Sequence, residues 1–463
     1  MSAAAAGLRG RGSSAKRFSL RGPRAKRGAP PVEYSILLTV TLCLVAFGVV
    51  MVFSASSTTS LLGESGDSAY YLKRTVIFGA FGLIALKILS MRGVAIVRPL
   101  TGFLLAASFV LLLVVHVPGV GVEANGATRW IGLGFFQIQP AEIMKISLIL
   151  YGAHLFASRP KITAELRTLV PYLAVVGTAS ALIVFEPDLG TAMIAAFSVG
   201  LLLVAAGVQM RYLGMIAAVL GALVLLMIVI EPYRMERLTS FLNPTADAGG
   251  SGFQGIQASI ALGSGGVFGV GLGESVQKAF YLPEAHTDMI AAVIGEELGL
   301  VGISLLIGLF ALFGYAGFRT AQRTKDRYQK LLAAGLTAMI LVQASLNLFA
   351  VMGLAPLTGV PLPFVSYGNS SLLVMLASVG LLLNIASGRA AVSANSRSNR
   401  RSPVKSKPKS RARAKSKPSA ARLRAIEGGR TNRSGANAKG RDRSGRNGGA
   451  RNSGPGRRRR AAG

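Results

Sequence analysis

The sequence of 463 residues predicts an all-α polytopic membrane protein, and three observations support this fold class. First, 51% of the residues are hydrophobic, and they gather in blocks of about 20, the length that lets a helix cross a hydrocarbon core. Second, about ten such blocks follow one another, whereas a soluble core would explain one or two. Third, 32 of the 51 Lys and Arg residues lie in the two end segments, 1–33 and 389–463, outside the apolar blocks.

Ten transmembrane helices are predicted, because a chain in lipid must satisfy its backbone polar groups internally. Arg and Lys favour the cytoplasmic side of a membrane, and they are found in both tails and in alternate loops with their flanks. We therefore expect both termini in the cytoplasm. The ten predicted spans are 35–54, 73–91, 98–117, 140–157, 168–185, 189–207, 210–230, 288–316, 331–352 and 368–388.

The formal net charge of +32 resides largely in the tails 1–33 and 389–463. Both are rich in Ser, Gly and Arg and lack the apolar residues for a core, so we predict disordered basic cytoplasmic segments. They would contact anionic lipid head groups. Binding to nucleic acid or to an acidic partner is the alternative interpretation, and we expect no nucleic-acid partner.

Within the predicted membrane domain, 34–388, one loop stands out by its length. It runs from 231 to 287, between predicted helices seven and eight, on the outer side of the membrane. Loops of this length are usually functional or disordered, and the apolar residues here argue against disorder. The pattern GFQGIQASIALGSGGVFGVGLGES indicates a short amphipathic helix followed by flexible backbone.

The predicted topology places several ionisable residues at the same, outer membrane face. Ionisable groups at membrane depth are costly and usually functional. A diphosphate on a lipid carrier would suit such a face, with basic groups to balance its charge and a carboxylate as general base. A transporter would need similar charges. The residues are Lys73, Arg74, Arg129, Glu142, Lys145, Glu186, Asp188, Lys278, His286, Asp288, Glu296 and Glu297.

Structural roles are the alternatives for several of these residues. Glu142 and Lys145 lie three apart and could form an intrahelical ion pair. Asp188 and Asp288 precede helices and could cap them. No spacing of Cys and His resembles a zinc site. The carboxylates of Glu186, Asp188 and Asp288 could instead bind a hard divalent cation together with substrate phosphates. The sequence contains no P-loop and no nucleophile elbow, so ATP-driven chemistry is not expected.

Four ordered motifs resemble the SEDS family (shape, elongation, division and sporulation), which includes FtsW and RodA. They are NGATRWIGLGFFQIQPAEIMK at 125–145, EPDLGTA at 186–192, GSGGVFGVGLGESVQKAFYLPEAHTDMIAAVIGEELG at 263–299 and TGVPLPFVSYGNSS at 358–371. The resemblance covers nearly all of 34–388 and is greater to FtsW than to RodA. Ala141 and Asn369 depart from it, since the family usually has Ser and Gly there.

The resemblance implies a peptidoglycan glycosyltransferase of the bacterial cytoplasmic membrane. It would polymerise lipid II into β-1,4 glycan strands with inversion at the anomeric carbon, and release undecaprenyl diphosphate. The family's essential aspartate falls on Asp288, which would be the base. Arg129, Lys145 and Lys278 would bind the diphosphate. Supporting roles would fall to Glu142, Glu186, Asp188, His286, Glu296 and Ser366.

The resemblance further implies a divalent cation, Mg²⁺ or Mn²⁺, whose ligands the sequence does not identify. It implies a class B penicillin-binding protein of the FtsI type as partner, with other divisome membrane proteins at the division septum. Two alternatives remain, a RodA-type polymerase of cell elongation and a lipid II flippase. The charges lie at one face and no inverted repeat is visible, which favours the enzyme over the flippase.

Overall fold

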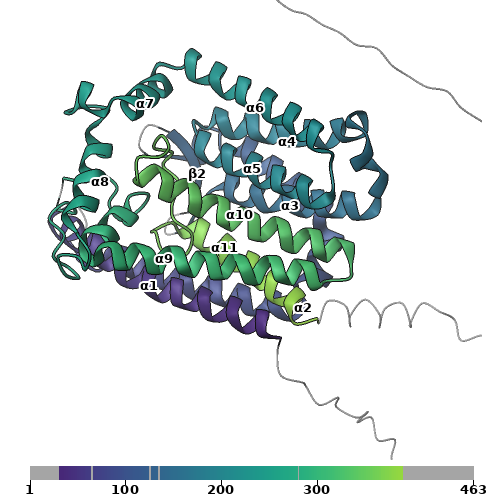
Figure 1. Ribbon diagram of the computed structural model, residues 1–463, viewed down its shortest axis with the longest axis horizontal. Helices are drawn as coiled ribbons and strands as arrows, with labels where there is room; N and C mark the ends of the chain where they lie inside the picture. The colour runs from purple at the N-terminus through teal and green to yellow at the C-terminus, as the bar shows by residue number, and fades with distance from the viewer. Residues whose placement is uncertain (1–30, 64–65, 125–126, 134–135, 280, 389–463) are drawn as a thin grey trace, which may run out of the picture. The chain divides into compact units, whose positions relative to one another are not determined.

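The computed structural model describes residues 31–63, 66–124, 127–133, 136–279 and 281–388, and this part of the chain is mostly helical (Figure 1). The predicted tails lie outside it, except for 31–33. The main elements, in chain order, are α1 (Val32–Leu62), α2 (Tyr70–Val114), β1 (Gly121–Ala124), β2 (Ala127–Leu133), β3 (Phe136–Ile138), α3 (Pro140–Ser158), α4 (Leu166–Phe185), α5 (Leu189–Ala206), α6 (Met210–Ile230), α7 (Pro232–Leu242), α8 (Phe253–Ser264), α9 (Ile290–Arg323), α10 (Arg327–Val351) and α11 (Asn369–Ala386).

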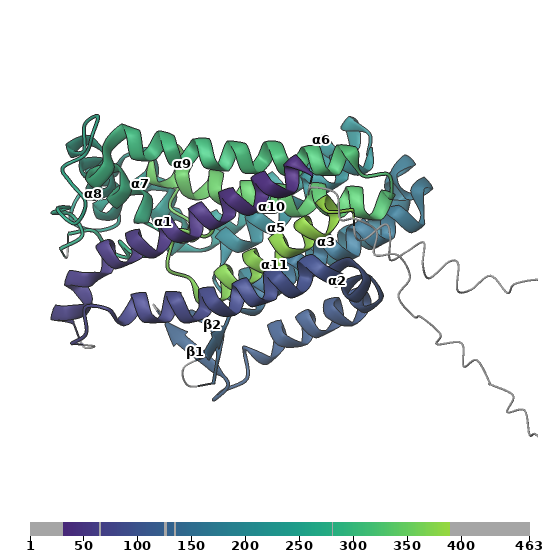
Figure 2. The same ribbon diagram turned by 90° about the horizontal axis from the view of Figure 1, so that it is seen from below.

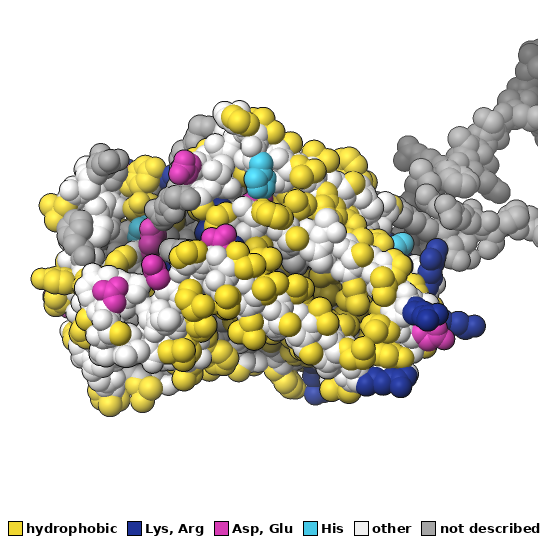
Figure 3. All heavy atoms as spheres, turned by 90° about the horizontal axis from the view of Figure 1, so that it is seen from above, with side chains coloured by type: hydrophobic (Ala, Val, Ile, Leu, Met, Phe, Trp, Pro, Cys, Tyr) yellow, Lys and Arg dark blue, Asp and Glu magenta, His cyan; other side chains and the backbone are white. Residues whose placement is uncertain are grey.

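All ten predicted spans coincide with helices, so the chain has an all-α polytopic membrane fold. Eight helices in the described ranges are long and apolar enough to cross a membrane: α1, α2, α4, α5, α6, α9, α10 and α11. The predicted sidedness remains a prediction. In its favour, Figure 3 shows the Lys and Arg side chains of one face gathered mainly at one end of the molecule.

Helix α2 contains two of the predicted spans, and the loop predicted at 92–97 is wrong, because helical structure continues through it. Its 45 residues would measure about 68 Å if straight, more than twice the hydrocarbon thickness. The ribbon instead turns back on itself (Figure 2). Phe78, near its start, lies 5.6 Å from Phe136 of β3, measured between ring centroids. Strand β1, which follows the end of α2, belongs to the same sheet, so both ends of α2 meet there.

This small sheet is the one departure from an all-helical fold, and it replaces the outer loop predicted at 118–139. Its order is β1-β2-β3, antiparallel throughout, with Ile131 opposite both Gly121 and Ile138. The Asn125–Gly126 pair between two short runs rich in β-branched residues is a strong hairpin signal. The sequence therefore already indicated the hairpin of β1 and β2.

The centre of the bundle is formed by α10 and α11. Helix α10 packs against α3, α5 and α9, while α11 packs against α2. Both are largely buried, whereas α6 has no buried residue and presents apolar side chains all round. A helix that is apolar on every side is expected where lipid surrounds it.

The long loop between α6 and α9 is structured. Its predicted short helix is α8, preceded by the further helix α7. The segment after α8, predicted as flexible backbone, is held by hydrogen bonds to α9: the N–H groups of Val270 and Gly271 donate to the carbonyls of Glu296 and Glu297, at 2.9 and 3.1 Å. These carbonyls are available because Gly299, with φ +63°, interrupts the helical backbone of α9.

Candidate active site around Asp288

Asp288 lies two residues before the first residue of α9 and is half-buried. Its Oδ1 accepts a hydrogen bond of 3.2 Å from the Thr287 hydroxyl. Its backbone carbonyl accepts one of 2.7 Å from Nδ2 of Asn347 on α10. The N-cap of α9 is Met289, and no side chain caps this helix. The capping interpretation of Asp288 is therefore wrong, and its carboxylate is available for chemistry.

The carboxylate of Asp288 borders a small pocket whose opposite wall is the segment 358–360. Gly359 has φ +67°, a conformation that L side chains rarely adopt. A Cβ on Gly359 would lie 3.9 Å from Oδ2 of Asp288. The backbone conformation thus favours glycine here, and the 3.9 Å distance shows that segment 358–360 lies next to the carboxylate. The pocket is lined by Asp288, Met289, Asn347, Ala350, Val351, Leu357, Thr358, Gly359 and Val360.

Burial and, after it, the negative charge of Glu284 raise the pKa of Asp288 to about 6. The Arg237 guanidinium of α7 acts in the opposite direction. Its Nη1 donates a 2.9 Å hydrogen bond to the Leu357 carbonyl, beside the pocket wall. A carboxylate with this pKa is ionised at neutral pH yet basic enough to accept a proton, as a general base requires.

His286 belongs to an aromatic cluster. Its ring centroid lies 4.1 Å from that of Tyr71 on α2 and 5.6 Å from that of Tyr367. Burial lowers the pKa of His286, so the imidazole is neutral at pH 7. Its backbone carbonyl accepts the N–H of Tyr367 at 2.9 Å. The neighbouring Ser366 hydroxyl accepts the N–H of Leu362 at 2.8 Å. His286 and Ser366 therefore shape the loop before α11.

Glu142 and Lys145 form the intrahelical ion pair considered from the sequence, with 2.8 Å between Nζ and Oε1. The side chains are 2% and 1% exposed, so the pair is deep inside the bundle. The second partner of Lys145 is Oε1 of Gln343 on α10, at 2.7 Å. In this structure the ammonium is therefore held by two protein groups.

Two amides on α10 connect this ion pair to the pocket. Nε2 of Gln343 donates to the Pro361 carbonyl at 3.0 Å. One helical turn further, Nδ2 of Asn347 donates to the carbonyls of Val360, at 2.8 Å, and Asp288. Asn347 thus ties together both walls of the pocket, and Gln343 holds the residue that follows one of them. Neither residue was predicted, although two amides four residues apart in an apolar span were a usable signal.

The turn between α4 and α5 is held from two sides. Oδ1 of Asp188 accepts the N–H of Thr191 at 2.9 Å, so the capping role of Asp188 is confirmed. Arg129 of β2 donates from Nε to the Glu186 carbonyl at 2.9 Å and from Nη2 to the Pro187 carbonyl at 2.6 Å. These contacts occupy the guanidinium of Arg129 with the turn rather than with the pocket.

Glu186 in this turn is 1% exposed, and among the described residues nothing hydrogen-bonds to its carboxylate oxygens. Burial and, after it, the negative charge of Asp188 raise its pKa to about 8, against a lowering by Arg129. Glu186 is therefore mainly neutral at pH 7. The turn also supports the pocket from behind, because a Cβ on Gly190 would lie 2.6 Å from the Thr358 carbonyl.

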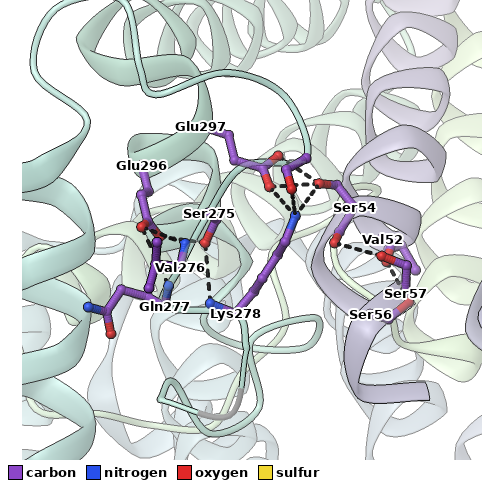
Figure 4. A network of polar contacts seen from close by, with 11 residues as sticks. Val52, Ser54, Ser56, Ser57, Ser275, Val276, Gln277, Lys278, Glu296 and Glu297 are labelled. Carbon is purple, nitrogen blue, oxygen red and sulfur yellow. Dashed lines mark hydrogen bonds and ion pairs between the residues drawn. The ribbon is translucent and has the colours of Figure 1, made fainter. Parts of the chain in front are cut away.

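Lys278 lies in a separate buried network that joins the long loop to α1 and α9 (Figure 4). Its Nζ is 2.8 Å from Oε1 of Glu297 and 2.6 Å from the Gly273 carbonyl. The Ser54 hydroxyl of α1 donates to the same carboxylate at 2.7 Å. Lys278 is 5% exposed. Its charge is therefore balanced by Glu297.

Glu296, next to this network, also holds the long loop between α6 and α9. Its carboxylate accepts hydrogen bonds from the Ser275 hydroxyl and from the N–H groups of Val276 and Gln277. The polar residues singled out in the sequence thus form several clusters, where a single one was expected. Of them, the carboxylate of Asp288 borders the pocket.

We predict that Lys278→Met destabilises the protein by about 3–5 kcal/mol, because it leaves Glu297 buried without its counter-charge. Thermal unfolding in detergent measures this loss. Adding Glu297→Gln should recover most of it, along with polymerisation of lipid-linked substrate. A double variant that is stable but inactive would contradict this structural role and indicate that Lys278 binds substrate.

In the described ranges, no three His, Cys, Asp or Glu side chains are grouped as a complete metal site. The carboxylate of Asp288 nonetheless lies beside the pocket. Mg²⁺ is commonly held by one or two carboxylates together with substrate phosphates. A divalent cation at Asp288 would therefore depend on substrate phosphates for most of its ligands.

Comparison with known proteins agrees with this architecture. The model of the FtsW/RodA/SpoVE family, described as cell cycle protein, matches residues 34–390. Stage V sporulation protein E of Bacillus subtilis is 41% identical over 354 residues, which cover 76% of this chain and 96% of that protein. The probable peptidoglycan glycosyltransferase FtsW of Trichlorobacter lovleyi is 40% identical over 361 residues, covering 77% and 94%.

Solved structures show the same fold. A chain of a peptidoglycan synthase complex that coordinates polymerization and crosslinking superposes with a TM-score of 0.63 at 31% identity, covering 76% of this chain and 97% of that one. The rod shape determining protein RodA of Thermus thermophilus gives 0.58 at 28% identity, covering 76% and 96%. The chain is a multi-pass membrane protein that belongs to the FtsW/RodA/SpoVE family of cell cycle proteins, the SEDS family.

Proposed function

We propose that this protein is a peptidoglycan glycosyltransferase that polymerises lipid II into β-1,4 glycan strands during septal wall synthesis. The observation that carries the proposal is the half-buried carboxylate of Asp288, which caps no helix and borders a pocket. Relatives about 40% identical are named probable peptidoglycan glycosyltransferases FtsW, which supports the same activity.

In the proposed reaction, Asp288 accepts the proton of the acceptor sugar's 4-hydroxyl. The oxygen attacks the anomeric carbon of the donor, a new C–O bond forms, and the bond from that carbon to the diphosphate breaks. Direct displacement inverts the anomeric centre. The proton ends on Asp288, and the electron pair leaves with undecaprenyl diphosphate.

The leaving diphosphate requires positive charge. Arg129, Lys145 and Lys278 were proposed for this role from the sequence, and each is engaged with protein groups instead. Arg237 of α7 also donates to a protein group, the Leu357 carbonyl, but Leu357 lines the pocket itself. We propose that Arg237, whose positive charge lowers the pKa of Asp288, contributes. A divalent cation, Mg²⁺ or Mn²⁺, would neutralise the diphosphate when bound.

The proposal includes a place and a partner. The Asp288 pocket opens on the outer face of the bacterial cytoplasmic membrane, as the charge distribution predicts. A class B penicillin-binding protein of the FtsI type, together with other divisome membrane proteins, works with it at the septum. The similarity to a synthase complex that couples polymerization and crosslinking supports such a partner.

A RodA-type elongation polymerase is the nearest alternative. The FtsW relative from Trichlorobacter lovleyi is 40% identical and RodA of Thermus thermophilus is 28% identical, which favours division. A lipid II flippase is the other alternative, and the placement of Asp288 beside a pocket near one helix end favours the enzyme. A tagged copy along the side walls, with none at midcell, would overturn the septal role.

The decisive experiment uses the full chain, purified with its class B partner, supplied with lipid II and Mg²⁺ or Mn²⁺. Glycan strands resolved by gel electrophoresis are expected, and chelation of the cation should abolish them. Proteoliposomes containing fluorescent lipid II test the flippase. Transport without any polymer would overturn the proposed function.

We predict that polymerisation rises with pH through about 6, since Asp288 must be ionised to accept a proton. Below the pKa, the ionised fraction falls about tenfold for each pH unit, and the rate should follow it. The measurement is initial rate at saturating cation between pH 4.5 and 8, with unfolding followed in parallel. A rate that stays flat down to pH 4.5 in folded protein would be inconsistent with Asp288 as base.

A further inference from the structure

Two polar contacts join α1 and α9, which lie side by side (Figures 1 and 2). In one, Glu33, 5% exposed, pairs with Arg319 at 3.5 Å and with Arg323. In the other, Ser54 donates to Glu297 at 2.7 Å. Ser54 follows Glu33 by 21 residues, about 31 Å along a helix. This spacing matches the hydrocarbon core of a bilayer, about 30 Å. A bilayer around the bundle would therefore have the boundaries of its hydrocarbon core near these two contacts.

The exposed fractions of the α9 side chains indicate the same boundary of the hydrocarbon core independently. From Ile290 to Glu297 every residue is buried by protein. The first exposed large apolar residue is Leu300, at 61%, one turn inside the Glu297 level. The exposed large apolar residues of α9 all lie between the two contacts: Leu300, Val301, Leu305, Ile307, Leu312, Tyr315 and Phe318.

The segment 265–273, here called the apolar loop, is fixed at the first lipid-facing turn of α9. The N–H of Leu300 donates to the Gly266 carbonyl at 3.0 Å, and the N–H of Val301 donates to the Val267 carbonyl at 3.1 Å. The break at Gly299 frees these two amides from the helix. The hydrogen bonds therefore set the depth of the loop.

The apolar loop presents its side chains outward. Phe268 is 83% exposed, the highest value among large apolar side chains of the described residues. Val267, Val270 and Leu272 are 56%, 47% and 55% exposed. The chain has no charged residue between Asp247 and Glu274. An exposed apolar surface of this kind marks an interaction site rather than a surface in water.

The backbone of the loop is prepared for an apolar environment. The N–H groups of Gly269, Val270 and Gly271 donate to carbonyls of Gly265, Glu296 and Glu297, at 2.7, 2.9 and 3.1 Å. Backbone donors that are already paired do not oppose insertion, because no group loses water without a replacement.

We propose that the apolar loop inserts into the lipid leaflet on the Asp288 side of the membrane. Its depth, its lack of charge and its continuity with the lipid-facing turn at Leu300 all favour lipid as the occupant. Insertion would hold this end of the long loop at the head-group level. Lys278 lies five residues after the apolar loop, so the buried network of Figure 4 would be held at the same level. The inference does not depend on the reaction proposed above.

The test places one tryptophan in the full chain in lipid nanodiscs. Trp130, the single tryptophan of the sequence, is first replaced by Phe. Phe268→Trp and, separately, Leu272→Trp are then added, and fluorescence is compared between ordinary and brominated phosphatidylcholine. The matched control is Leu62→Trp: Leu62 is 68% exposed at the end of α1, eight residues, about 12 Å, beyond the Ser54 level.

Blue-shifted emission, quenched about twofold or more by bromine near the head groups, is expected for Phe268→Trp and Leu272→Trp, since interfacial apolar groups reach about 5–10 Å into the acyl boundary. Leu62→Trp should emit as in water and resist quenching. Water-like emission from both loop variants would overturn the proposal. Blue-shifted emission without quenching would overturn it too, because protein, not lipid, would then cover the loop. Equal quenching at Leu62 would overturn the assigned depth.

Discussion

Asp288→Asn is expected to lower the rate of lipid II polymerisation by about 100- to 10,000-fold, the usual contribution of a positioned general base. Asparagine has nearly the same shape, and it can keep the Thr287 contact, but it does not accept a proton. Its backbone carbonyl still accepts from Asn347. Burial disfavours the charge of Asp288, so the neutral variant should be at least as stable as the parent. Initial rates and thermal unfolding measure the two effects.

The matched control is Glu284→Gln, on the same loop. Glu284 raises the pKa of Asp288 through its negative charge, so its removal should shift the acid limb of the pH profile toward lower pH. Most of the rate at pH 7.5 should remain at saturating cation. If Asp288→Asn polymerised at the parental rate, the assignment of the base would be abandoned. If Glu284→Gln abolished activity as well, Glu284 would itself be essential, as a cation ligand would be.

The sequence predicted local features well. Each apolar block became a helix because lipid leaves the backbone no alternative. Asp188 caps α5 because a carboxylate at that position meets free N–H groups. The ion pair of Glu142 and Lys145 follows from a spacing of three on one helix. All three depend on one continuous segment of the chain, and the last two on residues within one turn of each other.

Contacts between distant segments were not predictable in this way. Lys278 was expected at a diphosphate, and its main partner is Glu297, which itself binds Ser54, 243 residues away. Arg129 was expected there too, and it holds a turn 57 residues further along the chain. A cation that binds protein groups has the same charge, and the same predicted position on the outer side, as a cation that binds substrate. The difference lies in tertiary packing, which decides whether a cation meets protein or substrate.

The structure also shows how the two departures from the family motif, Asn369 and Ala141, are placed. Asn369 replaces a usual Gly, and it is the first residue of α11, where no left-handed backbone is required. Its Nδ2 donates to the Tyr367 hydroxyl at 3.2 Å. Ala141 is fully buried in α3 beside Glu142. Ala141 is thus accommodated by its helix, whereas Asn369 keeps its backbone conformation but leaves its Oδ1 buried without a hydrogen-bond partner among the described residues.

Lys145→Met should destabilise the protein by about 3–5 kcal/mol, because Glu142 then stays buried without its cation. Gln343 would also lose the donor to its Oε1. Since Gln343 holds Pro361, directly after the pocket residue Val360, polymerisation should fall with stability. Thermal unfolding in detergent and initial rates at a temperature well below the transition measure the two effects.

The double variant Glu142→Gln, Lys145→Met separates structure from substrate binding. Without charge on either side chain, most of the lost stability should return, as is observed when a buried ion pair is replaced as a whole rather than broken. Activity should then return with it. A double variant that unfolds like the parent but makes no glycan would show that Lys145 leaves its pair to bind the diphosphate during turnover. The static contacts of the pair would then describe only the resting enzyme.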